Sequence, residues 1–100
     1  MYLSQNQLNQ ITHFFADKPV KKVYLFGSYA DGDATEESDI DLLIESGEGF
    51  NFLKFHSEVD SLKNNLKKKI DIVSVGALRP DRYFSQFVHK QKKLIYEREC

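Results

Sequence analysis

The chain has 100 residues, of which 41% are hydrophobic and 29% are charged, and its formal net charge at pH 7 is -1. This length allows one compact domain spanning residues 1–100, and the composition is that of an ordinary globular protein. The near-neutral charge gives no general attraction to nucleic acid or to an anionic membrane, and the lysine runs at 67–69 and 92–93 are typical of solvated surface.

The N-terminal segment is predicted to form a helix, because its apolar residues recur at helical spacing. These residues are Leu3, Leu8, Ile11, Phe14 and Phe15. Ser4 can cap the start of the helix. The Asp17-Lys18-Pro19 stretch should end it, because proline disfavours helical geometry in the residue before it.

Two strands are predicted to follow this helix. Val20 to Phe26 is typical of a strand that ends abruptly at Gly27-Ser28. A polar, acidic connection then runs from Asp31 to Ser38. Asp39 to Glu45 is predicted to be the second strand, and its almost continuous apolar sequence after the two aspartates indicates burial on both faces.

The second half of the chain is predicted to add a helix with one apolar face, a strand and a further helix. The face of the first of these helices holds Phe52, His56, Val59, Leu62 and Leu66. The third strand should run from Ile70 to Val75, and an amphipathic helix should begin near Pro80. Lys93 to Glu97 is predicted to be either a short strand or an extension of that helix. The expected architecture is an α/β domain.

The expected location is the cytoplasm. The only cysteine is Cys100, so the chain cannot form an internal disulfide, which suits a reducing compartment. Met1 to Asp17 lacks the basic region and the unbroken apolar stretch of a signal peptide. No segment approaches the ~20 apolar residues needed to span a bilayer.

Asp39 and Asp41 are the first candidates for chemistry. Residues two apart in a strand point to the same face, so both carboxylates can converge on one metal ion. Such a pair is self-repulsive and costly to desolvate, and a divalent cation removes that penalty. Asp71, at the start of the third strand, could complete a three-carboxylate cluster for Mg²⁺, which prefers oxygen ligands. On its own, an Asp-x-Asp pair is more typical of a solvated strand end.

Gly27-Ser28 is the second candidate element, because it lies where the first strand ends. Glycine lets a backbone approach a ligand closely, and the serine hydroxyl can donate and accept hydrogen bonds. If a short helix begins at Ser28, its free amide groups point at an incoming phosphate. Taken alone, the pair is equally typical of a turn glycine followed by a helix-capping serine.

The two elements together form a more specific pattern. Gly27-Ser28, ten residues (29–38), then Asp39-Ile40-Asp41, with Asp71 on a later strand, resemble the signature of the polymerase-beta-type nucleotidyltransferase superfamily. The leading helix, the helix before Asp71 and Tyr96-Glu97 extend the resemblance to the minimal nucleotidyltransferases of bacteria and archaea. It implies the polymerase-beta-like fold, a small mixed β-sheet flanked by helices.

The resemblance implies a role for each of these residues. Gly27 and Ser28 would hold the terminal phosphates of ATP, the usual donor in the family, or of another nucleoside triphosphate. Asp39 and Asp41 would bind two Mg²⁺ ions that bridge those phosphates. Asp71 would help to hold one ion and could accept the proton of an attacking hydroxyl. The three aspartates would thus be both the metal ligands and the catalytic residues of an in-line attack on the α phosphorus that expels pyrophosphate.

The resemblance also suggests a partner. Small stand-alone members of the family are often encoded beside a HEPN-domain protein, as antitoxin and toxin, which implies transfer of AMP to a hydroxyl of such a partner. One alternative is a non-catalytic module that neutralises the partner by contact. Another is a small-molecule nucleotidylyltransferase of the aminoglycoside type, which at 100 residues would need a partner subunit or a homo-oligomer to build an acceptor pocket. No nucleic-acid or membrane partner is expected.

Asp31 is one departure from the family pattern, because many relatives carry an arginine at this position. Losing that cation would weaken binding of the phosphates or of the acceptor if residue 31 faces the site. Alternatively, residue 31 faces solvent and has no such effect.

Overall fold

The computed structural model describes residues 1–74 and 92–98. In chain order, its elements are α1 (Gln5–Ala16), β1 (Val20–Phe26), α2 (Ser28–Asp31), β2 (Ile40–Ser46), α3 (Phe52–Leu66), β3 (Ile70–Ser74) and β4 (Lys93–Glu97). The strands form one sheet in the order β3-β2-β1-β4. β1 pairs antiparallel with β2 and β4, whereas β2 and β3 are parallel. No helix in this part of the chain is long and apolar enough to cross a membrane.

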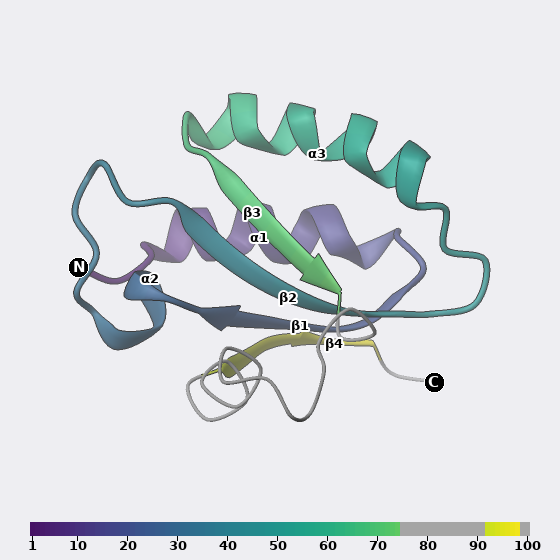
Figure 1. Cartoon of the computed structure of the whole chain (residues 1–100), viewed down its shortest axis with the longest axis horizontal. Coiled ribbons are helices and arrows are strands. Elements are labelled where there is room, and N and C mark those ends of the chain that lie inside the picture. Colours follow the sequence, from purple (N-terminus) through teal and green to yellow (C-terminus); the bar gives the residue numbers. More distant parts are fainter. Residues whose placement is uncertain (75–91, 99–100) are drawn as a thin grey trace.

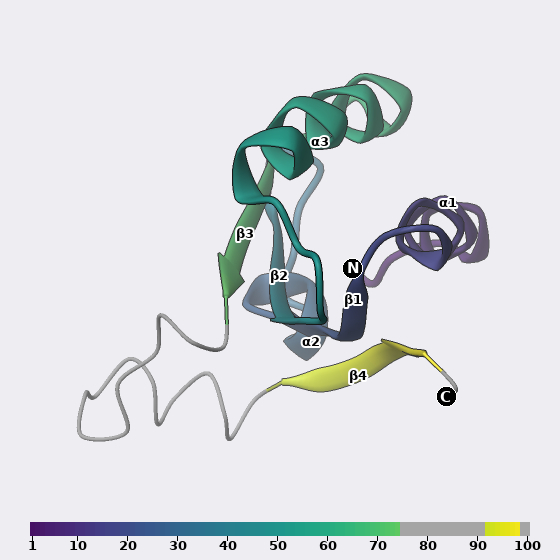
Figure 2. The same cartoon turned by 90° about the vertical axis from the view of Figure 1, so that its right-hand side faces the viewer.

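Helices α1 and α3 cover one face of this sheet (Figure 1 and Figure 2). Ile11 and Phe15 of α1 and Phe55 and Val59 of α3 belong to the same buried cluster as the inward-facing residues of the strands. The predicted α+β domain, with a small mixed sheet flanked by helices, is therefore confirmed.

Helix α1 begins and ends as the sequence predicts. The Ser4 hydroxyl accepts a hydrogen bond from the backbone N–H of Gln7 at 3.1 Å, and the Gln7 side chain accepts one from the backbone N–H of Ser4 at 2.8 Å. This reciprocal capping box satisfies two donors that the start of a helix leaves unpaired. The helix closes at Ala16 with Asp17 as its C-cap, ahead of Pro19.

The sheet is apolar on both faces near its centre, as the sequence of β2 predicts. Ile40, Leu42 and Ile44 face the helices and are fully buried in the main core. Leu43 points to the other face, where it is fully buried against Phe26 in a second, smaller cluster.

The buried face of α3 is displaced from the prediction. Phe55, Val59 and Leu62 are buried, whereas Phe52 and His56, which were expected on that face, are exposed. His56 follows Phe55 directly, which places it about 100° around the helix from the buried face. The rings of Phe52 and His56 contact each other instead, with their centroids 4.6 Å apart.

Strand boundaries differ slightly from the prediction at β2. The strand begins at Ile40, where pairing with β3 also begins, so Asp39 lies just before the strand and not within it. β3 starts at Ile70 as predicted and runs to Ser74. Val75 and the helix predicted from Pro80 lie outside the described residues.

Residues Lys93–Glu97 form the strand β4. Of the two structures expected for this segment, a short strand or an extension of the preceding helix, the strand is therefore the one observed. β4 pairs with β1 from Lys22 opposite Glu97 to Leu25 opposite Lys93. β1 thereby becomes an internal strand of the sheet.

Candidate functional site

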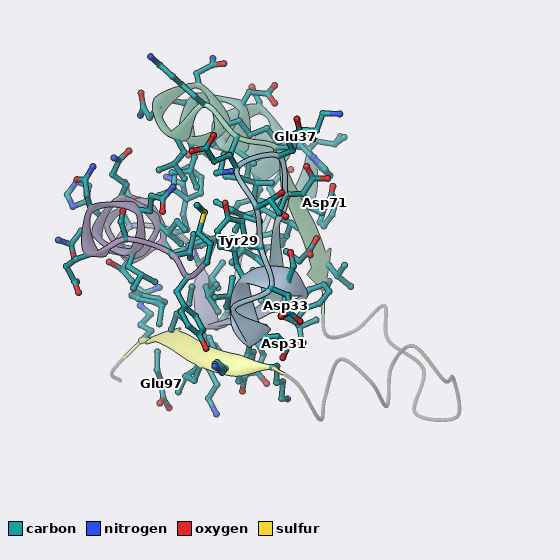
Figure 3. All side chains as sticks on the ribbon, turned by 90° about the vertical axis from the view of Figure 1, so that its left-hand side faces the viewer. Tyr29, Asp31, Asp33, Glu37, Asp71 and Glu97 are labelled. Atoms are coloured by element: carbon teal, nitrogen blue, oxygen red, sulfur yellow. The ribbon has the colours of Figure 1, made fainter. Side chains whose placement is uncertain are left out.

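The predicted site residues meet at one end of the sheet. β1 ends at the same end at which β2 and β3 begin (Figure 1). In the register of the sheet, Asp41 lies between Phe26 on β1 and Asp71 on β3. Figure 3 looks onto this end and shows Asp71 on the same side of the domain as Glu37 in the loop that precedes β2.

Asp41 and Asp71 lie on the face of the sheet opposite the helices. Leu42 and Ile72, which follow Asp41 and Asp71, pack in the core beneath α1 and α3. Because side chains alternate between the faces of a strand, Asp41 and Asp71 share the other face, and Asp39 directly precedes the strand that carries Asp41. Asp71 is exposed, whereas Asp39 and Asp41 are half-buried. The helix layer therefore leaves these carboxylates open to a ligand.

Gly27 lies directly against the carboxylate of Asp41. A Cβ atom at position 27 would be 2.1 Å from Oδ2 of Asp41 and 3.0 Å from its Cγ. The backbone of Gly27 has φ 76° and ψ -157°, a conformation that residues with a side chain adopt only under strain. The turn therefore favours glycine at residue 27, and any larger residue there would also displace the Asp41 carboxylate.

The electrostatics of Asp41 indicate that the three carboxylates act on one another. Burial, followed by repulsion from Asp71 and then from Asp39, raises the pKa of Asp41 from 3.8 to about 6. Asp41 is the central member of the group, because it is the one that both other charges penalise.

The donor set fits a hard divalent cation such as Mg²⁺. All three side chains offer oxygen ligands, and a cation among them would offset the burial and the repulsion that raise the pKa of Asp41. Within residues 1–74 and 92–98, no three acidic, histidine or cysteine side chains are already spaced as ligands of one metal ion.

Ser28 is the first residue of the short helix α2, as the sequence suggests. The N-cap of that helix is Gly27, not Ser28, and it makes no side-chain capping bond. The alternative of a helix-capping serine is therefore not what the structure contains. The half-buried Ser28 lies one residue beyond the glycine that contacts Asp41.

Asp31 is the last residue of α2 and is exposed. It lies on the same side of the domain as Asp33 and Asp71 (Figure 3). Exposure fits both interpretations of this departure from the family pattern, because Asp71 of the carboxylate group is exposed as well.

Lys68 is half-buried beside the loop that leads to Asp39, whereas its sequence run predicted a place on the solvated surface. Its ammonium group donates hydrogen bonds to the backbone oxygens of Glu36, at 2.7 Å, and Ser38, at 3.3 Å. Both acceptors belong to the loop that leads to Asp39. Nothing in the Lys67-Lys68-Lys69 run distinguishes the middle lysine, because its role depends on how the turn after α3 approaches that loop.

The family model described as "Polymerase beta, Nucleotidyltransferase" matches residues 9–100. A Methanocaldococcus jannaschii protein named as a candidate protein adenylyltransferase is 45% identical to this chain over 77 residues, which are 77% of this chain and 76% of that protein.

Two solved structures share the fold. One, described as a candidate minimal nucleotidyltransferase, is 29% identical, with a TM-score of 0.74 and 89% of each chain covered. The other is a complex of a tri-AMPylated Shewanella oneidensis HEPN toxin with an MNT antitoxin. Its matched chain is 21% identical, with a TM-score of 0.71, and the match covers 96% of this chain and 74% of that chain.

Asp41→Asn is expected to stabilise the metal-free protein at neutral pH. The carboxyl is protonated in both folded and unfolded chains below pH 3.8, so no penalty exists there. The folded state is penalised progressively as the pH rises, and fully so above about 6, the pKa of folded Asp41. At about 1.4 kcal/mol per pKa unit the penalty approaches roughly 3 kcal/mol, and solvent screening reduces it to about 1 kcal/mol.

Thermal melting of both proteins in EDTA between pH 3.5 and 8 measures this stabilisation. In a domain of this size, about 1 kcal/mol raises the melting temperature by roughly 4–8 °C. Asp60→Asn, on the exposed face of α3, is the control for loss of one carboxylate. A stabilisation by Asp41→Asn that is equal at all pH values would contradict the raised pKa of Asp41, which burial and then repulsion from the other two aspartates produce.

Gly27→Ala is expected to destabilise the fold and displace the Asp41 side chain. The backbone conformation alone should lower the free energy of unfolding by about 1–3 kcal/mol. The matched control is Gly49→Ala, since Gly49 also has a positive φ, 81°, but an added Cβ would meet no atom within 4 Å. Chemical unfolding measures both variants, and NMR titration follows the Asp41 carboxyl. An unmoved Asp41 signal in Gly27→Ala would refute the contact.

Proposed function

The chain belongs to the polymerase beta nucleotidyltransferase family, and from this premise we propose that it transfers AMP from ATP, with Mg²⁺, to a hydroxyl group of a partner protein. The observation that carries the proposal is the packing of Gly27 against Asp41, with Asp39 and Asp71 acting on the same carboxylate. A phosphate-binding turn and a carboxylate cluster thereby adjoin each other.

Asp39, Asp41 and Asp71 are the residues that would hold Mg²⁺. Bound there, Mg²⁺ supplies positive charge against the phosphate oxygens as negative charge moves from the attacking oxygen to the pyrophosphate. The half-buried setting of Asp41 strengthens its attraction for a cation, because burial disfavours an unpaired carboxylate.

Gly27 and Ser28 would hold the terminal phosphates. The absence of a side chain at residue 27 lets the backbone approach a phosphate, while the Ser28 hydroxyl can donate to a phosphate oxygen. This arrangement would orient the α phosphorus towards the acceptor, whose oxygen forms the new bond as the bond to pyrophosphate breaks.

Asp71 is the carboxylate best exposed to an acceptor. It lies on β3, the outermost strand on its side of the described sheet, whereas Asp41 lies between β1 and β3. We assign to Asp71 the acceptance of the proton that the attacking hydroxyl loses.

The proposed acceptor is a HEPN-domain protein, and the proposed biological role is that of its antitoxin. Support comes from the Shewanella oneidensis complex, which contains an AMPylated HEPN toxin together with an MNT antitoxin of the same fold. The M. jannaschii relative, named as a candidate protein adenylyltransferase, supports a protein acceptor.

Co-expression with the HEPN-domain partner tests the proposal. The wild-type chain should add the mass of an adenylyl group to a partner hydroxyl, such as that of a tyrosine, and should relieve toxicity. The double variant Asp39→Asn/Asp41→Asn should still bind the partner but leave it unmodified and toxic, because the carboxylate cluster has lost two charges. Intact mass spectrometry and a growth assay provide the readouts.

A double variant with the same change in charge, Glu48→Gln/Asp60→Asn, is the control, since both residues are exposed and lie outside the carboxylate cluster. If the Asp39→Asn/Asp41→Asn variant neutralises fully and no mass is added by the wild-type chain, the protein inhibits by contact and the enzymatic proposal is wrong.

Ser28→Ala is expected to slow transfer less than loss of an aspartate does. One hydrogen bond to a charged group contributes about 1.5–3 kcal/mol, which corresponds to a roughly ten- to hundredfold lower rate. Single-turnover kinetics at saturating Mg²⁺ measure this rate, with the exposed Ser61→Ala on α3 as the control. An unchanged rate would remove Ser28 from the phosphate site.

A further inference from the structure

The peptide groups on both sides of Asp39 are held by the turn between α3 and β3. On one side, the backbone oxygen of Ser38 accepts a hydrogen bond from the ammonium group of Lys68 at 3.3 Å. On the other, the backbone N–H of Ile40 donates to the backbone oxygen of Lys69 at 3.0 Å. Asp71 follows two residues later, so the segment 68–71 contacts both peptides of Asp39 and carries a second carboxylate of the site.

The ammonium group of Lys68 also connects this loop to α2. It lies 5.2 Å from the centre of the Tyr29 ring and donates a second hydrogen bond to the backbone oxygen of Glu36 at 2.7 Å. Tyr29 is almost completely buried and directly follows Ser28. One positive charge therefore joins α2, directly after the Gly27-Ser28 turn, to the loop that carries Asp39.

The loop before Asp39 is also held by bonds within the loop and by bonds to α2. Its internal bonds join Thr35, Glu37 and Ser38 to one another. Two bonds join it to α2: the backbone N–H of Asp33 donates to the backbone oxygen of Ser28 at 3.0 Å, and the Tyr29 hydroxyl donates to the backbone oxygen of Thr35 at 3.4 Å. Both bonds to α2 lie before residue 36, so Lys68 provides the attachments nearest to Asp39 on this side, through the backbone oxygens of Glu36, at 2.7 Å, and Ser38, at 3.3 Å.

We propose that Lys68 is a positioning residue, which fixes the peptide before Asp39 so that the Asp39 carboxylate stays beside Asp41 and Asp71. This inference rests on the proposed metal-dependent function of that carboxylate cluster. Lys68 acts through Asp39 and not on the substrate, since its ammonium group is engaged by two backbone oxygens and an aromatic ring.

The neighbouring lysines provide a matched control. Lys67 and Lys69 are exposed, whereas Lys68 is half-buried. Lys69→Met removes the same charge from the same turn and leaves the backbone bond from Ile40 in place. Lys68→Met removes the ammonium group while keeping most of the apolar stem, so the start of β2 retains its backbone bond to residue 69 but the Ser38 peptide is released.

Two measurements test the role of Lys68, with Mn²⁺ alone as the metal probe. Titration followed by electron paramagnetic resonance should show a roughly tenfold or greater loss of Mn²⁺ affinity in Lys68→Met, the usual effect of losing a group that orients a ligand. Lys68→Arg should recover most of this loss, because it keeps the charge and the donors. In an Asp39→Asn background, Lys68→Met should cause little further loss.

Hydrogen exchange of the peptide covering residues 33–39 is the second measurement, and it does not depend on metal or activity. Exchange should be faster in Lys68→Met than in the wild type or Lys69→Met. If Lys68→Met does not fold, Lys68→Gln, which keeps a shorter polar side chain, replaces it in both measurements.

The outcomes separate this inference from the proposed function. Suppose that the wild-type chain binds no Mn²⁺ but that the Lys68→Met variant exchanges faster over residues 33–39. The positioning contact is then supported, and the metal-dependent function is wrong. Unchanged exchange over residues 33–39 overturns the positioning role. An equal loss of Mn²⁺ affinity in Lys69→Met, or an undiminished effect of Lys68→Met without the Asp39 carboxylate, also overturns it.

Discussion

The close approach of Gly27 to Asp41 is the constraint on which the site depends. No other amino acid could occupy residue 27 without moving the Asp41 carboxylate, which lies where a Cβ would be. This contact joins the end of β1 to the start of β2, two strands that the sheet already aligns with Phe26 opposite Asp41. The sheet register thus brings the turn and the carboxylate together, and the missing side chain lets them touch.

The site is assembled at the expense of stability. Burial, followed by repulsion from Asp71 and Asp39, raises the pKa of Asp41, so the folded chain is penalised when this carboxyl is ionised. The core opposite, where Ile40, Leu42 and Ile44 are fully buried, offsets this penalty, since each such side chain contributes roughly 1.5–3 kcal/mol. Because side chains alternate along β2, one face of this strand packs in the core and the other face carries the charged site.

Much of this arrangement could be predicted from the sequence, because local chemistry determines it. The Ser4 cap, the proline after α1 and the apolar run of β1 predicted those elements with little error. The motif that joins Gly27-Ser28 to the later aspartates led us to expect these residues together, and Gly27 does lie against Asp41 at one end of the sheet. What could not be predicted depends on contacts between distant segments. The buried face of α3 and the strand character of residues 93–97 follow from packing and pairing, and the role of Lys68 follows from the meeting of two turns.

The position of β4 beside β1 has a consequence for how the chain folds. Residues 20–74 contain three strands and the carboxylate end of the sheet, but β1 gains its second neighbour only when residue 97 pairs with residue 22. Closing so long a loop is entropically slower than pairing β1 with β2. On a ribosome, the site can therefore assemble while one edge of β1 is still open, and an open strand edge is a template for aggregation. Lys21 and Lys22 lie on this strand, where positive charge discourages the edge from pairing with a second nascent chain.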